Sequence, residues 1–186
     1  GQVQNAGFEE TAANGKPRTW FYNNPDSVNN RIQLSTVEKF SGQQSLEMIK
    51  RNDQAPLIVS TSIPITTDKI SKLRISAKVK TNTEEILSNF YLQTFDQHEK
   101  RIGGSGKPFE FDPNKKGQWQ TVDFTILIDP KVKSGVLFLV LGSKGELWVD
   151  DVETEWITGA PSAKSKAFAS EILKLMKENS IVRDSV

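Results

Sequence analysis

The sequence predicts an all-β sandwich or barrel with a single helix at its C-terminal end. Short runs rich in β-branched and aromatic residues recur along most of the chain, and clusters of glycine, proline, asparagine and serine separate them. Residues 72–80 alternate between polar and apolar side chains, which is typical of a strand with one buried and one solvated face. After Trp156 this pattern stops and a helical period begins.

The strand-like runs can be placed from their composition and from the turn residues between them. We expect strands at residues 31–35, 45–50, 57–61, 72–80, 89–95, 119–128, 135–141 and 145–157. The run 136–141 is apolar at every position, so we expect this strand to be central and covered on both faces. The glycines of 103–106 lack the helix and the lysine of a phosphate-binding loop, so we expect a flexible loop there.

The C-terminal region reads as a linker followed by an amphipathic helix. Residues 158–162 (TGAPS) form the linker, and Phe168, Ile172 and Leu175 then follow at the spacing of one apolar helix face. Such a helix either packs back on the sandwich or begins a further domain. We therefore expect a β-sandwich module at 1–158, and a linker and helix at 159–186.

Composition excludes several classes of function. The 24 basic and 23 acidic residues give a formal charge of +1, which offers no basis for binding nucleic acid or an anionic membrane. Cysteine is absent and His98 is the single histidine, so thiolate and multi-histidine metal sites are excluded. No apolar run approaches the roughly 20 residues of a membrane span. Gly1 and Gln2 read as a tag remnant before a mature N-terminus, so we expect an exported, extracytoplasmic protein.

Four motifs occur in a characteristic order: NAGFEE at 5–10, SGQQSLEM at 41–48, GQWQTVDFTI at 117–126 and GELWVDDVETEWI at 145–157. Together they resemble the galactose-binding-like jelly rolls, and in particular the carbohydrate-binding modules of the family 4, 9 and 22 type. The resemblance covers about residues 3–158. It implies a jelly-roll β-sandwich that serves as a non-catalytic accessory module of an exported bacterial protein and binds a glycan.

The last of these motifs raises the question of what pairs with its carboxylates. Side chains alternate along a strand, so either Asp150 or Asp151 should face inward, where a bare carboxylate is costly. The resembling modules often hold a structural calcium, a cation that takes six to eight oxygens. The resemblance implies as its ligands the carbonyls of Gly7, Ser41 and Gln44 and the carboxylates of Glu9 and Asp150. Without a metal, Asp150 would instead cap a turn or meet a basic side chain.

The resemblance also implies that a glycan lies in a groove on the concave sheet. Tyr91, Gln93 and Phe95 share one face of the 89–95 strand, and the opposite face is more typical of a core. Tyr22 is a further candidate for stacking on a sugar ring. In the alternative interpretation these aromatic residues are core or rim packing, and a loop at 103–116 plugs the groove.

The tail 168–186 (FASEILKLMKENSIVRDSV) resembles the segment that opens the catalytic region of bacterial C-terminal-processing (tail-specific) serine peptidases. This implies a C-terminal peptidase domain in the same native chain. As an alternative to a glycan-binding module, the present chain would then be a structural or protein-interaction domain that binds no sugar. We expect no enzyme activity, because His98 lies in a polar turn and the neighbouring carboxylates at 9–10, 84–85 and 150–151 should diverge along strands.

Overall fold

The protein is a sandwich of two antiparallel sheets, described here by a computed structural model that covers residues 3–157 and 170–178. The β9 sheet, named after its central strand, contains β1 (Phe21–Asn23), β4 (Leu57–Pro64), β9 (Ser134–Leu141), β6 (Ser88–Phe95) and β7 (Arg101–Pro108), in that order. The β10 sheet contains β2 (Arg31–Ser35), β3 (Ser45–Lys50), β10 (Gly145–Ile157), β5 (Ser71–Lys80) and β8 (Gln120–Ile128).

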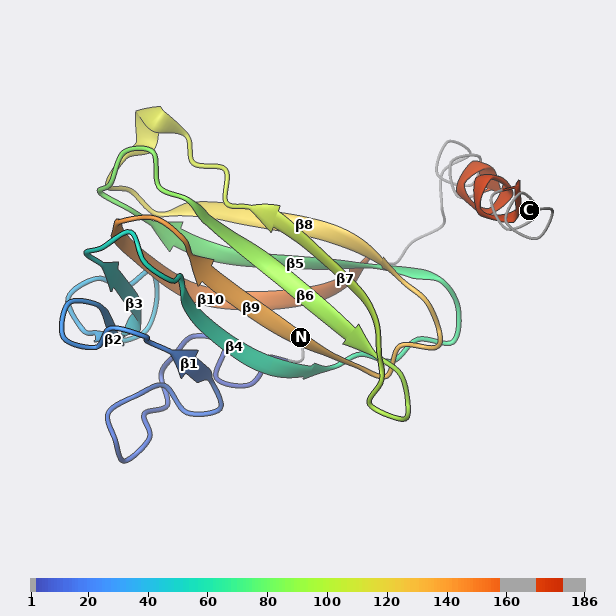
Figure 1. Ribbon diagram of the computed structural model, residues 1–186, viewed down its shortest axis with the longest axis horizontal. Coiled ribbons are helices and arrows are strands. Elements are labelled where there is room, and N and C mark those ends of the chain that lie inside the picture. Colours follow the sequence, from blue (N-terminus) through green and yellow to red (C-terminus); the bar gives the residue numbers. More distant parts are fainter. Residues whose placement is uncertain (1–2, 158–169, 179–186) are drawn as a thin grey trace.

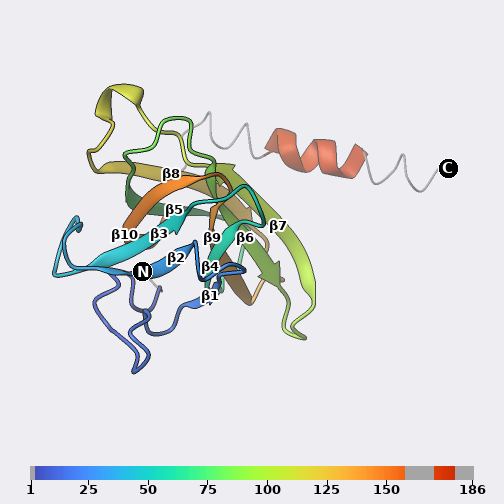
Figure 2. The ribbon, with the colours of Figure 1, turned by 60° about the vertical axis from the view of Figure 1, so that its left-hand side comes forward.

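The chain passes repeatedly from one sheet to the other. Strands β4, β5 and β6 alternate between the two sheets, and β8, β9 and β10 do the same. Figures 1 and 2 show the resulting two layers, with β4, β9, β6 and β7 side by side in one and β3, β10, β5 and β8 in the other. This alternation lets each strand bury one face against the opposite sheet, as expected of a jelly roll.

The core lies between the sheets and consists of the inward-facing residues of each strand. On β5 the alternation predicts the buried side correctly, since its four apolar residues are almost fully buried and the intervening polar ones are half-exposed. Phe90 of β6 is 1% exposed and packs against Phe109 and Phe124, with ring centroids 4.6 Å and 5.2 Å apart. Strands from both sheets thus meet in one aromatic contact.

Most of the predicted strands are confirmed, and β2 and β3 have the predicted bounds. The strand at 136–141 is central in its sheet, as expected, but the expectation that both of its faces are covered is wrong. Leu137, Leu139 and Leu141 face the core, but Val136, Phe138 and Val140 lie half-exposed on the outer face. An apolar run can therefore be a central strand whose second face still meets solvent.

The flexible loop expected at 103–106 is also wrong, because these residues belong to β7 and pair with β6. His98 lies in the turn between these two strands, as predicted. The prediction fails because glycine is generally rare in strands. Here glycine is required, because a large side chain of the neighbouring strand lies over this edge strand. The three-residue strand β1 has no sequence signal that separates it from a loop.

A short helix at 170–178 confirms the helical period. Its Leu173, Leu175 and Met176 are 45%, 49% and 61% exposed, so the apolar side chains of the described helical residues are not buried. The linker 158–162 and, from the tail 168–186, residues 168–169 and 179–186 lie outside the described residues. None of the described helical segments combines the length and apolar character that a membrane crossing requires.

The fully buried ring of Phe90 should carry a large part of the packing energy between the sheets. We expect Phe90→Ala to lower the free energy of unfolding by about 3–5 kcal/mol, because it removes a buried ring and leaves a cavity. Phe21→Ala is the matched control, since Phe21 is 70% exposed and its loss should cost less than about 0.5 kcal/mol. Urea unfolding measures both, and equal losses would contradict the assigned core.

Candidate functional site

The first candidate site is the tyrosine face, the outer face of the β9 sheet around Tyr91, Gln93 and Phe95. Strand β6 buries alternate residues in the core and leaves these three half-exposed on the opposite side. The structure therefore brings the three predicted ligand residues to one face. Tyr22 does not join them, because it pairs with the core residue Val59 and by alternation points to the other side of the sheet.

A row of aromatic side chains crosses the tyrosine face at right angles to the strands. Tyr91 of β6 lies opposite Phe138 of β9, and their ring centroids are 6.2 Å apart. Phe138 lies opposite Ser60 of β4, which in turn lies opposite Phe21 of β1. With neighbouring strands about 4.8 Å apart, the row extends over roughly 15 Å. Phe138 was missed because its strand was expected to be covered on both faces.

The glycines of β7 provide space for the tyrosine ring. A methyl group at Gly104 would overlap the Tyr91 hydroxyl, and one at Gly106 would lie 2.9 Å from the ring carbon Cδ2. Arg101 donates a hydrogen bond of 2.6 Å from Nη2 to the same hydroxyl. The Tyr91 ring thus leans over β7 with its hydroxyl fixed, which gives the face a preformed aromatic surface.

The second candidate site is the carboxylate cluster, formed by Glu9, Asp150 and Asp151. Strand β10 shifts register between Asp150 and Glu153, and Asp151 adopts a left-handed backbone with φ of 46°. This irregularity overturns the expectation that the two aspartates diverge. Asp150 is fully buried, as expected for one of the pair. By alternation, however, it shares the outer face of Trp148, beneath the loop at 36–44, and does not lie in the core.

The loop at 36–44 donates most of the hydrogen bonds that the cluster accepts, from its backbone amides and from one hydroxyl. Asp150 Oδ2 accepts from the amides of Phe40 and Ser41, at 3.0 Å and 3.2 Å. Asp151 Oδ2 accepts from the Ser41 hydroxyl at 2.7 Å. Glu9 accepts from the amide of Gln43 through both carboxylate oxygens, at 3.0 Å and 3.1 Å. The loop is thereby tied to the last strand and to the N-terminal segment.

Gly7 lies beside the carboxylates of Asp150 and Asp151 and beside the aliphatic part of Glu9, whose carboxylate lies next to Gly42. An added methyl group there would be 3.3 Å from Asp151 Oδ1, 3.9 Å from Asp150 Oδ1 and 3.6 Å from Glu9 Cγ. Gln44 adjoins them, since its Nε2 donates to the carbonyl oxygen of Phe8 at 2.8 Å. All five residues predicted from the resemblance therefore meet in one place. Asp151 is an additional member that sequence reasoning missed, and a paired aspartate at a strand irregularity is the signal that could have found it.

The carboxylates of the cluster carry negative charge that no basic side chain in the described part of the chain neutralises through an ion pair. Burial raises the pKa of the Asp150 carboxyl, with a further rise from Asp151, and the amide hydrogen bonds oppose this only in part. Because the folded-state pKa exceeds the unfolded one, the contribution of this group to stability increases as pH falls through the raised value. None of the ion pairs within 3–157 and 170–178 includes Glu9, Asp150 or Asp151. A bound cation would favour the ionised form and reverse the effect.

The donor set partly fits a hard cation. Within the described part of the chain, no three acidic, histidine or cysteine side chains are grouped closely enough to hold a metal alone. Carbonyl oxygens of the 41–44 loop and of Gly7 would have to complete the coordination. Calcium accepts such a mixture of carboxylate and carbonyl oxygens, whereas softer metals require nitrogen or sulfur.

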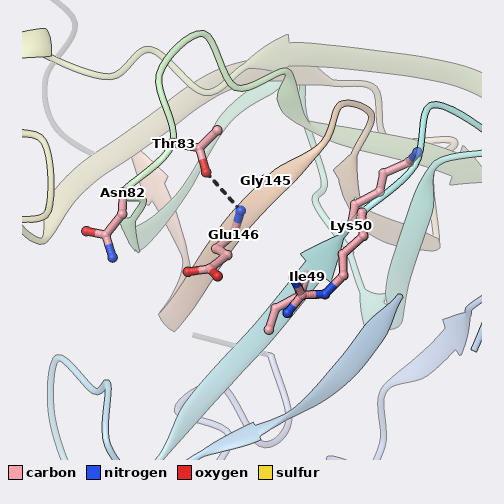
Figure 3. A pocket seen from close by; sticks show the side chains of 7 residues that line it. Ile49, Lys50, Asn82, Thr83, Gly145 and Glu146 are labelled. Carbon is pink, nitrogen blue, oxygen red and sulfur yellow. Dashed lines mark hydrogen bonds between the residues drawn. The ribbon is translucent and has the colours of Figure 1, made fainter. Parts of the chain in front are cut away.

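Two hollows lie away from both candidate sites. The larger, of about 470 Å³, opens between β3, the start of β10 and the segment after β5, where Thr83 Oγ1 accepts a hydrogen bond of 3.0 Å from the Glu146 amide (Figure 3). The other, of about 420 Å³, has Ile86, Phe109 and Phe111 among its lining residues. No predicted ligand residue lines either hollow.

Comparison with known proteins shows the fold and not a family. No family model matches the chain. No curated protein matches it either. Among solved structures, the enzymatically active domain of tailspike protein 4 from bacteriophage CBA120 is 11% identical with a TM-score of 0.62, over 84% of this chain and 21% of that one.

Two carbohydrate-binding modules align over most of their own length. The CBM22-1 xylan-binding domain of Xyn10C from Paenibacillus barcinonensis is 16% identical with a TM-score of 0.53, over 83% of this chain and 93% of that one. TmCBM61, solved with beta-1,4-galactotriose, is 12% identical with a TM-score of 0.52. The alignment covers 83% of this chain and 97% of that one. The chain therefore has the β-sandwich jelly-roll fold found in carbohydrate-binding modules.

Removing the Asp150 carboxylate should release the 36–44 loop. In the presence of a chelator, we expect Asp150→Ala to lower the free energy of unfolding by about 1–3 kcal/mol, because the part-buried hydrogen bonds from the Phe40 and Ser41 amides lose their acceptor. Amide hydrogen exchange at Phe40 and Ser41 should accelerate. Asp151→Asn is the control, since asparagine tolerates the left-handed backbone at this position and can still accept from the Ser41 hydroxyl, and it should cost less than about 1 kcal/mol. Unchanged exchange at residues 40 and 41 would show that Asp150 does not hold the loop.

Proposed function

We propose that this chain is a non-catalytic carbohydrate-binding module and that a glycan chain lies across the tyrosine face. The aromatic row of Tyr91, Phe138 and Phe21 carries this proposal, because stacked sugar rings need flat apolar surfaces arranged along a line. Gln93 beside the row supplies an amide that can bond to hydroxyl groups. The proposal is supported by the fold, since similar solved structures include a xylan-binding domain and a module in complex with beta-1,4-galactotriose.

The geometry also suits an extended ligand better than a small one. The row crosses four strands and continues beyond Tyr91 over the glycines of β7. A chain of sugars could therefore contact several strands at once, with the side chains of β9 as an apolar floor. Polysaccharides are encountered outside the cell, so we propose that the module belongs to an exported bacterial protein.

A second candidate function is a protein-interaction domain attached to a serine peptidase. The observation that favours it is the exposure of Leu173, Leu175 and Met176 on the C-terminal helix. Exposed apolar side chains that are grouped on one element are typical of a surface that meets a partner. This function requires no sugar binding, so a glycan screen separates the two candidates.

We also propose that calcium occupies the carboxylate cluster and has a structural role. Glu9 and Asp150 would be its carboxylate ligands, and the carbonyls of Gly7, Ser41 and Gln44 would complete the shell, with Asp151 adjacent. The support is a fully buried carboxylate whose pKa is raised by burial and whose neighbours are also acidic. The cation would stabilise the junction of the N-terminal segment, the 36–44 loop and β10.

Substitutions on the tyrosine face test the glycan proposal. Against a polysaccharide panel with calcium present, we expect the wild-type chain to bind at least one glycan saturably. Tyr91→Ala and Phe138→Ala should each weaken that binding by about tenfold or more, because each removes a stacking surface. Isothermal titration calorimetry measures the affinities.

Tyr22→Ala is the matched control, because this tyrosine is also partly exposed but points to the other side of the sheet. It should bind as the wild type does. Equal losses from Tyr22→Ala and Tyr91→Ala would refute the assignment of the face. A blank across the whole panel would favour the protein-interaction candidate.

Calcium addition after chelation tests the cluster. We expect the melting temperature to rise by roughly 5–10 °C at calcium concentrations far above the dissociation constant. Magnesium should produce a smaller shift, since it demands a tighter octahedral shell. Asp150→Asn should abolish the calcium-dependent shift. Identical melting with chelator and with calcium, together with no metal in elemental analysis, would eliminate the proposed site.

A further inference from the structure

Two aromatic side chains lie outside the core on the opposite face of the molecule. Phe40, from the 36–44 loop, and Trp119, from the segment before β8, have ring centroids 6.1 Å apart in an edge-to-face arrangement. Neither belongs to the buried core cluster, and Phe40 is 47% exposed. Large aromatic side chains that add nothing to the core and remain open to solvent are characteristic of binding surfaces.

Both rings are held in place by their backbone. The amide of Phe40 donates to the buried carboxylate of Asp150 at 3.0 Å, which ties the loop to β10. Trp119 follows Gly117, whose positive φ of 74° turns the chain and whose amide donates to the carbonyl of Thr81 at 2.9 Å. The pair therefore rests on two anchored segments, so little conformational entropy is lost when a ligand stacks on it.

Some basic side chains of the neighbouring strand β5 form ion pairs within the described part of the chain, and others do not. Strand β5 directs basic side chains to this outer face, and two of them are neutralised: Arg74 pairs with Asp123 at 2.9 Å, and Lys80 pairs with Glu38. Lys78 lies between them, and no ion pair among the described residues includes it.

The Lys78 ammonium lies beside the aromatic pair. Its Nζ donates to the Thr121 hydroxyl at 2.6 Å and is 4.9 Å from the centre of the Phe40 ring. Asp150 lies opposite Lys78 on β10, but the two form no ion pair. A cation with a hydroxyl and an aromatic neighbour, but no ion pair, can still form a charge-assisted bond to an incoming anion. A ligand that carries a carboxylate beside an apolar ring face could bond to the ammonium and stack on the aromatic ring at the same time.

We propose that Phe40, Trp119, Lys78 and Thr121 form a second binding surface, which takes an acidic sugar such as a hexuronate unit of a polysaccharide. The sugar ring would stack on the exposed ring of Phe40, with the half-exposed Trp119 beside it, and its carboxylate would bond to Lys78. A pyranose ring combines an apolar face with a polar edge, and this matches a surface made of two rings bordered by a hydroxyl and a cation. This surface is on the β10 sheet and is independent of the tyrosine face.

The test compares oligouronates with their methyl esters, which keep the sugar rings and remove the charge. Oligomers of galacturonate, glucuronate and alginate are titrated into the full chain and followed by NMR shifts and calorimetry. We expect an oligouronate to bind, with shifts centred on Phe40 and Trp119, and binding should weaken with added salt. Phe40→Ala should reduce the affinity by about tenfold or more.

Lys78→Gln supplies the discriminating measurement. It should weaken binding of the acid by about fivefold and leave the affinity for the methyl ester unchanged, because only the ion pair is lost. Lys72→Gln is the matched control, since Lys72 is on the same face of β5 but is remote from the aromatic pair, and it should bind normally. Tyr91→Ala should also bind the acid normally. Thermal melts establish that each variant is folded.

Three results would overturn the proposal. One is the absence of binding by every oligouronate. Another is loss of acid binding in Tyr91→Ala but not in Phe40→Ala, which would place the ligand on the tyrosine face. The third is equally tight binding of polyglutamate, which would show attraction to any polyanion and no recognition of a sugar ring.

Discussion

The buried carboxylate of Asp150 is the interaction on which the outer surface of the β10 sheet depends. It accepts hydrogen bonds from two consecutive loop amides, and a second tie, from the Val152 amide to the Ala6 carbonyl at 2.9 Å, holds the N-terminal segment to the same strand. A fully buried carboxylate without a basic partner is unfavourable by itself. If calcium binds there as proposed, it would neutralise the Asp150 carboxylate at the junction of the three segments. The position of Phe40, whose amide bonds to that carboxylate, would then depend on calcium as well.

The β9 sheet presents a different surface because its strands carry no such irregularity near the centre. Strict alternation on β6 and β9 directs leucine and phenylalanine to the core and leaves Tyr91 and Phe138 adjacent on the outer face. The glycines of β7 leave room for the ring that leans over them. The two sheets thus offer two aromatic surfaces of different chemistry, one an apolar row and the other a ring pair beside a lysine.

The fold follows from sequence wherever alternation and turn residues are strong. The period-two pattern of β5 predicts its buried side correctly, and the N-terminal and C-terminal motifs bring Gly7, Glu9 and Asp150 together as expected. The sequence does not predict which side chains from other strands contact a given residue. Gly104 and Gly106 look like a loop because the tyrosine that requires them is on another strand. Phe40 and Trp119 are far apart in the sequence, and only the fold brings them into contact.

We propose that a glycan chain lies across the tyrosine face. A structure of the complex with an oligosaccharide that binds, or a map of its NMR contacts, tests this most directly. We expect intermolecular contacts at Tyr91, Phe138 and Gln93, along a line that crosses the strands. Contacts centred instead on the hollow lined by Ile86, Phe109 and Phe111 would contradict it.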